Sequence, residues 1–233
     1  VPHLAVRSIQ NLEALEILIK QLSEKAKIKE ILIIAGSINK PVGDLYESMQ
    51  VLNSGLIQKY GINKVGIAGH PEGSPDISDI QLQLALKKKN EWAQQQGLDV
   101  YIETQFAFDS KPVLEWEKKI RENGNTLPVH VGIPGPATIK TLLKFAISSG
   151  IGPSLQMIKK QSKNITRLFT TQSPDKYIYG LARGMEQDKE CLIKNFHFYP
   201  FGGFLKTVEW ASALEKGLLI LDDSKGFEVL SNT

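Results

Sequence analysis

The sequence predicts an α/β protein with a parallel sheet, arranged as an incomplete (β/α)8 TIM barrel that has about six of its eight strands. Short apolar segments alternate with longer segments of helical spacing, which indicates repeated strand–helix units. The strands are almost continuously apolar, as parallel strands covered by helices usually are. Polar residues gather just after the strand ends, and the carboxyl ends of barrel strands are where catalytic groups of this fold lie.

The predicted strands are short runs, most of them bounded by Gly, Pro, Asn or Asp. They span residues 3–7, 30–36, 64–69, 100–106, 129–133 and 196–199. A closed barrel of eight strands needs two more, so either two strands escape detection or the chain is two β/α units short. We expect missing units to leave open sheet edges and uncovered apolar surface.

The predicted helices fill the intervals between the strands and show amphipathic spacing. They span residues 11–25, 44–58, 78–96, 111–123 and 138–148, with further helices at about 175–188 and at 205–216. The C-terminal residues 218–233 open with an apolar run at 218–221, which predicts a short strand or a helical extension. No functional role follows from this tail.

Two features disfavour a dinucleotide-binding Rossmann fold and a nucleic-acid-binding protein. No G-x-G-x-x-G motif follows the first or the second predicted strand. The formal charge is only +3, and the longest basic run is three lysines at 87–89. We therefore expect no nucleic-acid partner.

The remaining composition predicts a cytoplasmic protein without a membrane partner. Hydrophobic residues make up 42% of the chain and charged residues 23%, as in ordinary globular proteins. Cys191 is the single cysteine, so the chain can form neither an intramolecular disulfide nor a cysteine-based zinc site. No apolar stretch reaches the roughly 18 residues of a membrane span, and no signal peptide is recognisable.

Three segments together carry a resemblance to a known family. They are Ala-Gly-His-Pro-Glu-Gly-Ser-Pro at 68–75, Thr-Gln-Phe-Ala-Phe-Asp at 104–109 and Phe-His-Phe-Tyr at 196–199. In this order and at these strand ends they resemble the methylenetetrahydrofolate reductases, flavin-containing barrels of one-carbon metabolism. The resemblance spans nearly the whole chain, and the second segment is the most specific. It implies that residues 1–233 form a single barrel domain that lacks strands 1 and 2.

The resemblance also implies an activity. NADH or NADPH would reduce FAD, and the reduced flavin would pass hydride to 5,10-methylenetetrahydrofolate to give 5-methyltetrahydrofolate. The flavin supplies the difficult chemistry, while the protein supplies orientation and electrostatics. The sequence does not distinguish NADH from NADPH or fix the direction of the reaction, and a homo-oligomer remains one option for the assembly.

Three residues are the candidates for substrate binding. The side-chain amide of Gln105 can both donate and accept hydrogen bonds, which suits a pterin ring or a nicotinamide carboxamide. Phe106 and Phe145 offer aromatic surface for the pterin, with Phe145 the better candidate for stacking. Ordinary core packing is the alternative role for these rings, and it is the favoured one for Phe108.

The resemblance places eight residues against FAD: His3, Ala35, Gly36, Tyr46, His70, Ser74, Lys88 and Lys89. A glycine at 36 allows the backbone to approach the isoalloxazine ring. The lysine pair would compensate the charge of the pyrophosphate. Simpler roles stay open: a turn glycine, a packed tyrosine and a solvated helix face.

The chain departs from the family pattern at four points. It has no Phe-Glu-Phe-Phe-Pro-Pro-like run and so lacks the family's catalytic Glu, whose loss typically costs about 10²–10⁴-fold in rate. Ser37 stands where the family has a catalytic Asp. Ser74 replaces the second His of the Pro-Glu-x-His-Pro loop, and Gly203 occupies the position of an Arg found in some relatives. No catalytic residue is therefore assigned with the family's role.

Two alternatives remain beside the reductase. The departures favour a non-catalytic flavin- or folate-binding remnant, or a subunit that another chain completes. A flavin-free TIM-barrel enzyme such as a lyase would instead need a metal or Schiff-base site, and the sequence shows no His, Asp and Glu cluster at ligand spacing. We therefore expect no metal.

Overall fold

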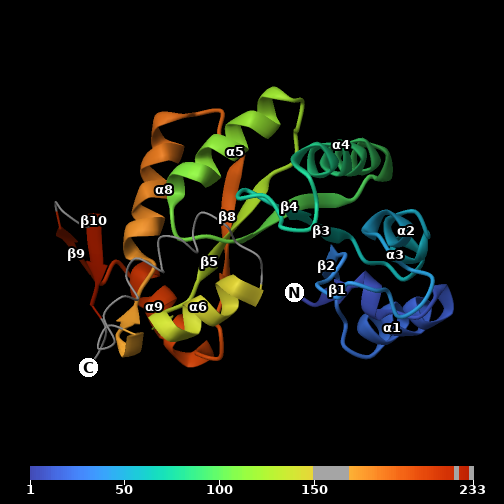
Figure 1. The fold of residues 1–233 in the computed structure, drawn as a ribbon, viewed down its shortest axis with the longest axis horizontal. Helices are drawn as coiled ribbons and strands as arrows, with labels where there is room; N and C mark the ends of the chain where they lie inside the picture. The colour runs from blue at the N-terminus through green and yellow to red at the C-terminus, as the bar shows by residue number, and fades with distance from the viewer. Residues whose placement is uncertain (149–167, 223–225, 231–233) are drawn as a thin grey trace. The chain divides into compact units, whose positions relative to one another are not determined.

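The computed structural model describes residues 1–148, 168–222 and 226–230. Its main sheet has six strands in the order β1-β2-β3-β4-β5-β8 (Figure 1). The strands are β1 His3–Ala5, β2 Glu30–Ile34, β3 Lys64–Gly69, β4 Asp99–Phe106, β5 Val129–Pro134 and β8 Ile193–Tyr199. All six predicted strands are confirmed, with ends that shift by up to three residues.

The strand order follows the chain order without a reversal. A doubly wound sheet reverses its order at a switch point, so this sheet is not of that kind. Among the described residues no ladder joins β8 back to β1. The α/β class with a parallel sheet is confirmed, and within the described ranges β1 and β8 each pair with a single neighbour in this sheet.

The chain divides into two compact units, which are described separately. The first comprises Val1–Gly69, Leu84–Glu103 and Thr126–Pro128. The second comprises His70–Gln83, Thr104–Asn125 and Val129–Thr233.

In the first unit, β1, β2 and β3 pair in parallel and set the faces of the sheet. His3 lies beside Leu32, and Leu32 lies beside Gly66, so these three positions share one face. Ile31 and Ile33 on the opposite face are fully buried. Helices cover this part of the chain: η1 Val6–Ser8, α1 Leu12–Glu24, α2 Ser48–Leu52, α3 Leu56–Lys59 and α4 Asp79–Gln96, whose first five residues belong to the second unit.

The helix predicted over residues 44–58 was wrong as a single element. Helix α2 starts only at Ser48, after a capping box formed by Glu47 and Gln50. Gly55 then adopts a left-handed φ of 73° and begins α3. A left-handed residue interrupts the helical backbone, and glycine adopts it without steric cost. The amphipathic spacing runs on through the turn at Gly55, so the sequence pattern did not show that the helix is interrupted there.

In the second unit, β5 and β8 pair in parallel, with Gly132 beside His197 and Pro134 beside Tyr199. Helices follow the strands: α5 Ser110–Glu122, α6 Ile139–Ser148, α8 Asp175–Gln187 and α9 Phe204–Glu215. Helices α5 and α8 lie side by side (Figure 1), and Gly180 of α8 meets Ser110 of α5. These helices match the predicted ranges within one residue at each end.

Two small antiparallel pairs complete the second unit. They are β6 Ala137–Thr138 with β7 Thr171–Gln172, and β9 Leu219–Asp222 with β10 Gly226–Val229. The strand alternative for the apolar run at 218–221 is therefore confirmed. Residues 223–225 and 231–233 of the tail lie outside the described residues. Within the described ranges, no helix combines the length and apolarity needed to cross a membrane.

Candidate functional site

An aromatic cluster lies at the carboxyl ends of β4 and β8 in the second unit. It consists of Phe106, which ends β4, Phe145 of α6, Tyr199, which ends β8, and Phe201 just beyond. The Phe201 ring centroid is 4.7 Å from that of Phe106 and 4.5 Å from that of Phe145, with the Phe145 and Phe201 rings stacked. The structure thus brings together Phe106 and Phe145, both predicted for the substrate.

Helix α6 carries Phe145 to the cluster through its apolar face. Ile139, Leu142 and Ala146 of this helix are buried against Phe106. Near its start, the amide of Thr141 donates to the hydroxyl of Thr138 over 3.2 Å, a local capping contact. Phe145 itself is half-buried, so its ring packs against neighbours while part of it faces solvent.

Phe201 is the residue of the cluster that sequence reasoning missed. Its φ of +47° is left-handed, a conformation that bulky residues rarely adopt and that costs on the order of 1–3 kcal/mol. A tight turn holds it there, since the amide of Gly203 donates to the carbonyl of Pro200 over 2.7 Å. The Gly-Gly pair at 202–203 signals a turn in the sequence, but it does not reveal which side chain the turn presents.

Gln105 precedes Phe106 on β4 and is half-buried. Side chains alternate along a strand, so Gln105 leaves β4 on the face opposite to Phe106, which packs on α6. The side-chain oxygen of Gln105 is buried. The amide therefore lies at the strand end next to the aromatic cluster, on the face that α6 does not cover.

His70 and Ser74 lie in the loop after β3, also in the second unit. The amide of Gly73 donates to the carbonyl of His70 over 3.1 Å, which closes a turn. The Ser74 hydroxyl accepts from the amide of Asp76 over 3.4 Å. Both predicted residues are half-buried, and the Ser74 hydroxyl already serves the local turn.

In the first unit, three predicted residues lie at the start of β1 or just after β2. His3 opens β1 and is exposed, while the carbonyl of Ala35 accepts from the amide of Arg7 over 2.9 Å. Gly36 has a φ of +92°, and a Cβ added there would lie 3.1 Å from the Cβ of Ala5. A side chain at 36 would therefore be strained and crowded. Ser37, next in the chain, is exposed.

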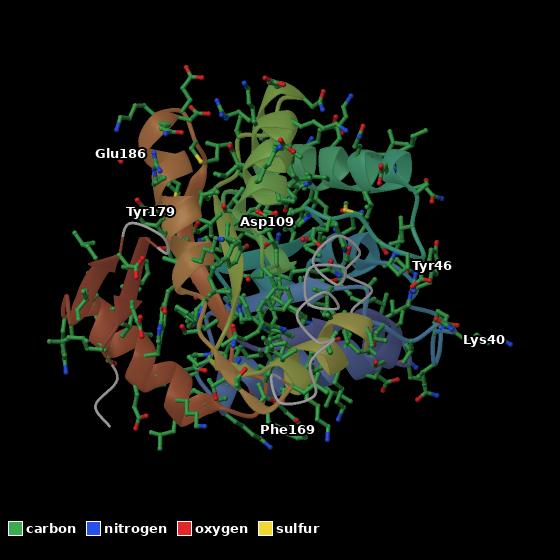
Figure 2. All side chains as sticks on the ribbon, turned by 60° about the vertical axis from the view of Figure 1, so that its left-hand side comes forward. Lys40, Tyr46, Asp109, Phe169, Tyr179 and Glu186 are labelled. Atoms are coloured by element: carbon green, nitrogen blue, oxygen red, sulfur yellow. The ribbon has the colours of Figure 1, made fainter. Side chains whose placement is uncertain are left out.

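Tyr46 is 56% exposed and lies at the surface of the first unit (Figure 2). Its ring does not pack in the core, which removes the helix-packing alternative. The backbone carbonyl of Tyr46 accepts from Arg7 Nε over 3.0 Å, and its amide donates to the side chain of Gln50 over 2.8 Å. These contacts order the loop before α2.

Lys88 and Lys89 lie in different environments on α4. Lys88 is exposed, whereas Lys89 is only 8% exposed. Burial lowers the pKa of Lys89 to about 8, and the charge of Glu47 partly opposes this shift. Within the described ranges Lys89 forms no salt bridge with a carboxylate. A buried ammonium without a salt-bridge partner is costly, and an anionic ligand would relieve that cost.

In the part of the chain that the structure describes, no three His, Cys, Asp or Glu side chains gather as a metal ion would require. No protein-family model matches the chain. The candidate residues therefore form two separate groups: an aromatic cluster and an amide in the second unit, and a glycine turn and a buried lysine in the first.

Proposed function

We propose that this chain is an FAD-dependent oxidoreductase of one-carbon metabolism that interconverts 5,10-methylenetetrahydrofolate and 5-methyltetrahydrofolate with NADH or NADPH. One observation carries the proposal: the half-buried Gln105 lies at the carboxyl end of β4 and precedes Phe106, whose ring belongs to the cluster with Phe145 and Phe201. A pterin presents a flat ring with adjacent donors and acceptors. Aromatic rings with one amide at a strand end suit such a ligand.

The consecutive strand order supports the barrel part of this proposal. A (β/α)8 barrel has its strands in chain order, each followed by a helix, and binds ligands at the carboxyl ends of the strands. The sheet order β1-β2-β3-β4-β5-β8 has that property. We assign the six strands to six of the eight units of a barrel.

The residues of the first unit fit the chemistry of FAD. The resemblance places the backbone of Gly36 against the flavin ring, and in the structure its missing side chain leaves room for Ala5 in a left-handed turn. Lys89 is a buried cation without a salt bridge to a carboxylate of the described residues, and it suits a phosphate. Lys88 on the exposed side of α4 adds a second positive charge. Bound FAD would supply the hydride chemistry.

In this proposal the residues of the chain bind and orient. The Gln105 amide would donate to and accept from the pterin or the nicotinamide on the face of β4 that α6 does not cover. Two such hydrogen bonds, each contributing about 0.5–1.5 kcal/mol, correspond to roughly 10–100-fold in affinity. The family's carboxylates are absent, so no residue of this chain is assigned as a proton donor.

Ser37 favours a second candidate function, a flavin- or folate-binding protein without catalysis. It stands exposed where the resembling family has a carboxylate, and a neutral hydroxyl cannot supply that charge. The two candidates differ in whether bound flavin accepts electrons from a nicotinamide nucleotide.

The absorption spectrum of the purified full chain, after incubation with FAD and removal of free FAD, tests both candidates. A reductase is yellow and loses its colour when NADH or NADPH is added without oxygen. A flavin-binding protein is yellow and keeps its colour, and a colourless chain contradicts both the reductase and the flavin-binding protein.

Lys89→Met should weaken FAD binding about tenfold or more, while Lys87→Met, at an exposed position of the same helix, serves as the matched control.

A further inference from the structure

Three hydrogen bonds within the second unit hold Thr104 and the carbonyl of Gln105. The Thr104 hydroxyl donates to the carbonyl of Gln105 over 2.8 Å and accepts from the amide of Gly132 over 2.8 Å. The Tyr199 hydroxyl donates to the carbonyl of Thr104 over 3.1 Å. Groups from β5 and β8 thus converge on Thr104, the residue that precedes Gln105, and Tyr199 holds the peptide between the two.

Gly132 makes this convergence possible. A Cβ at position 132 would lie 2.7 Å from the carbonyl oxygens of both Thr104 and Gln105, closer than real contacts allow. The Thr104 oxygen is the atom that accepts from Tyr199. Any side chain at 132 would therefore displace the backbone of β4 at the peptide that Tyr199 holds.

Tyr199 reaches past one strand to make its bond. The sheet order is β4-β5-β8, so its phenol spans from β8 to the carbonyl of Thr104 on β4. Its ring is fixed as well, with centroids 5.7 Å from Phe106 and 6.2 Å from Phe201. Thr104 is fully buried, and a buried hydrogen bond of this kind is hard for water to replace.

We infer that Tyr199 is a positioning residue that sets the direction in which Gln105 presents its amide. The inference rests on the proposed function, because it assigns the ligand of that amide to a pterin or a nicotinamide. A glutamine side chain loses rotamer freedom on binding. A fixed backbone before Gln105 reduces the range of orientations that its side-chain amide can adopt, so less freedom is lost when the ligand binds. Tyr199 thereby acts through Gln105 and not by touching the ligand.

Tyr199→Phe tests this role, because it removes one hydroxyl and keeps the ring. We expect the side-chain amide resonance of Gln105, identified by its loss in Gln105→Ala, to shift in the Tyr199→Phe spectrum. In the FAD-loaded full chain we expect the Kd of 5-methyltetrahydrofolate to rise about tenfold. Tyr179→Phe on α8 (Figure 2) is a matched change. The Tyr179 ring lies next to that of Phe227, and its variant should alter neither quantity.

The double variant Tyr199→Phe/Gln105→Ala separates positioning from direct contact. If Tyr199 acts through Gln105, the double variant binds no more weakly than Gln105→Ala alone. Additive losses, or an unmoved Gln105 resonance in Tyr199→Phe, overturn the inference. A wild-type chain that binds no 5-methyltetrahydrofolate contradicts the proposed function instead, and the Gln105 resonance then still decides whether Tyr199 sets the amide.

Discussion

Glu103 is the most perturbed carboxyl group of the first unit. It lies on β4 and is only 2% exposed. Burial raises its pKa from 4.5 to about 9, and the negative charge of Glu30 adds to the shift. The Glu103 side chain is therefore protonated at neutral pH. As a neutral carboxylic acid it can donate a hydrogen bond, which a carboxylate cannot do.

The pH dependence of stability follows from this shift. Between pH 4.5 and about 9 the folded chain holds a proton on Glu103 that the unfolded chain has lost. The contribution of this group is complete below pH 4.5 and is lost as the pH rises through about 9, at up to about 1.4 kcal/mol per pH unit. In urea unfolding, the decrease of the free energy of unfolding with pH should be smaller in Glu103→Gln than in wild type. Glu122→Gln, an exposed change on α5, should keep the wild-type decrease. Equal slopes in wild type and Glu103→Gln would refute the assignment.

The second prediction at the residue scale concerns the effect of the Tyr177 hydroxyl on stability. Its hydroxyl is buried on α8 without a hydrogen-bond partner among the described residues, and burial raises its pKa well above 10.0. Removing an unsatisfied buried hydroxyl costs nothing and can help. Tyr177→Phe should therefore equal or exceed the wild-type free energy of unfolding, by up to about 2 kcal/mol. As a control, Tyr101→Phe removes a hydroxyl that bonds to Glu30 and should lower the free energy of unfolding. A loss of stability in Tyr177→Phe would contradict this account.

At the scale of elements, glycine sets how closely α8 approaches α5. Gly180 and Gly184 lie four residues apart and so share one helix face. A Cβ on Gly184 would lie 2.3 Å from Leu114 Cδ1, and one on Gly180 would lie 2.2 Å from Ser110 Oγ. Either side chain would push the helices apart.

Gly184→Ala tests this packing because two effects oppose each other. Alanine gains about 1 kcal/mol of helix propensity, whereas overpacking typically costs about 1–3 kcal/mol. We expect a net loss of stability in thermal unfolding. Leu114→Ala opens space at the contact, so the double variant should lose less than the sum of the two single losses. A Gly184→Ala chain more stable than wild type would show that α8 has room at this point.

Regular elements were predictable because each repeats a pattern over several residues. The strands showed apolar runs, and α1, α5 and α8 showed amphipathic spacing. The pairs β6–β7 and β9–β10 were not resolved beforehand, since two to four residues carry too little periodicity. The left-handed residue between α2 and α3 was equally hidden, because an apolar pattern does not record φ.

The candidate site was predictable only in part. Gln105, Phe106 and Phe145 followed from the resemblance, and the structure joins the two rings in one cluster. The ring of Phe201 completes that cluster through a left-handed backbone that no sequence pattern announces. The bond from Tyr199 to Thr104 depends on strand register and on the absence of a side chain at position 132.

At the scale of the whole molecule, the strand order is the feature that most constrains function. Barrels with consecutive strand order bind ligands around the carboxyl ends of their strands, whereas a doubly wound sheet binds them where its strand order reverses, and this sheet has no such reversal among the described strands. The alternation of strands and helices alone fits a doubly wound sheet as well as a barrel, and the polar residues after the strand ends favoured the barrel. Closure into a barrel was not readable from the alternation, because it depends on strand number and stagger.

The central claim is that Gln105 binds the substrate that the reduced flavin of this chain reduces. The direct measurement is the rate at which 5,10-methylenetetrahydrofolate restores the yellow colour of the chemically reduced, FAD-loaded chain in the absence of oxygen. The account predicts rapid reoxidation in wild type, a rate lower by roughly 10–100-fold at subsaturating substrate in Gln105→Ala, and no change in Gln94→Ala at an exposed position of α4. A reduced flavin that the folate leaves colourless, or equal rates in wild type and Gln105→Ala, would contradict it.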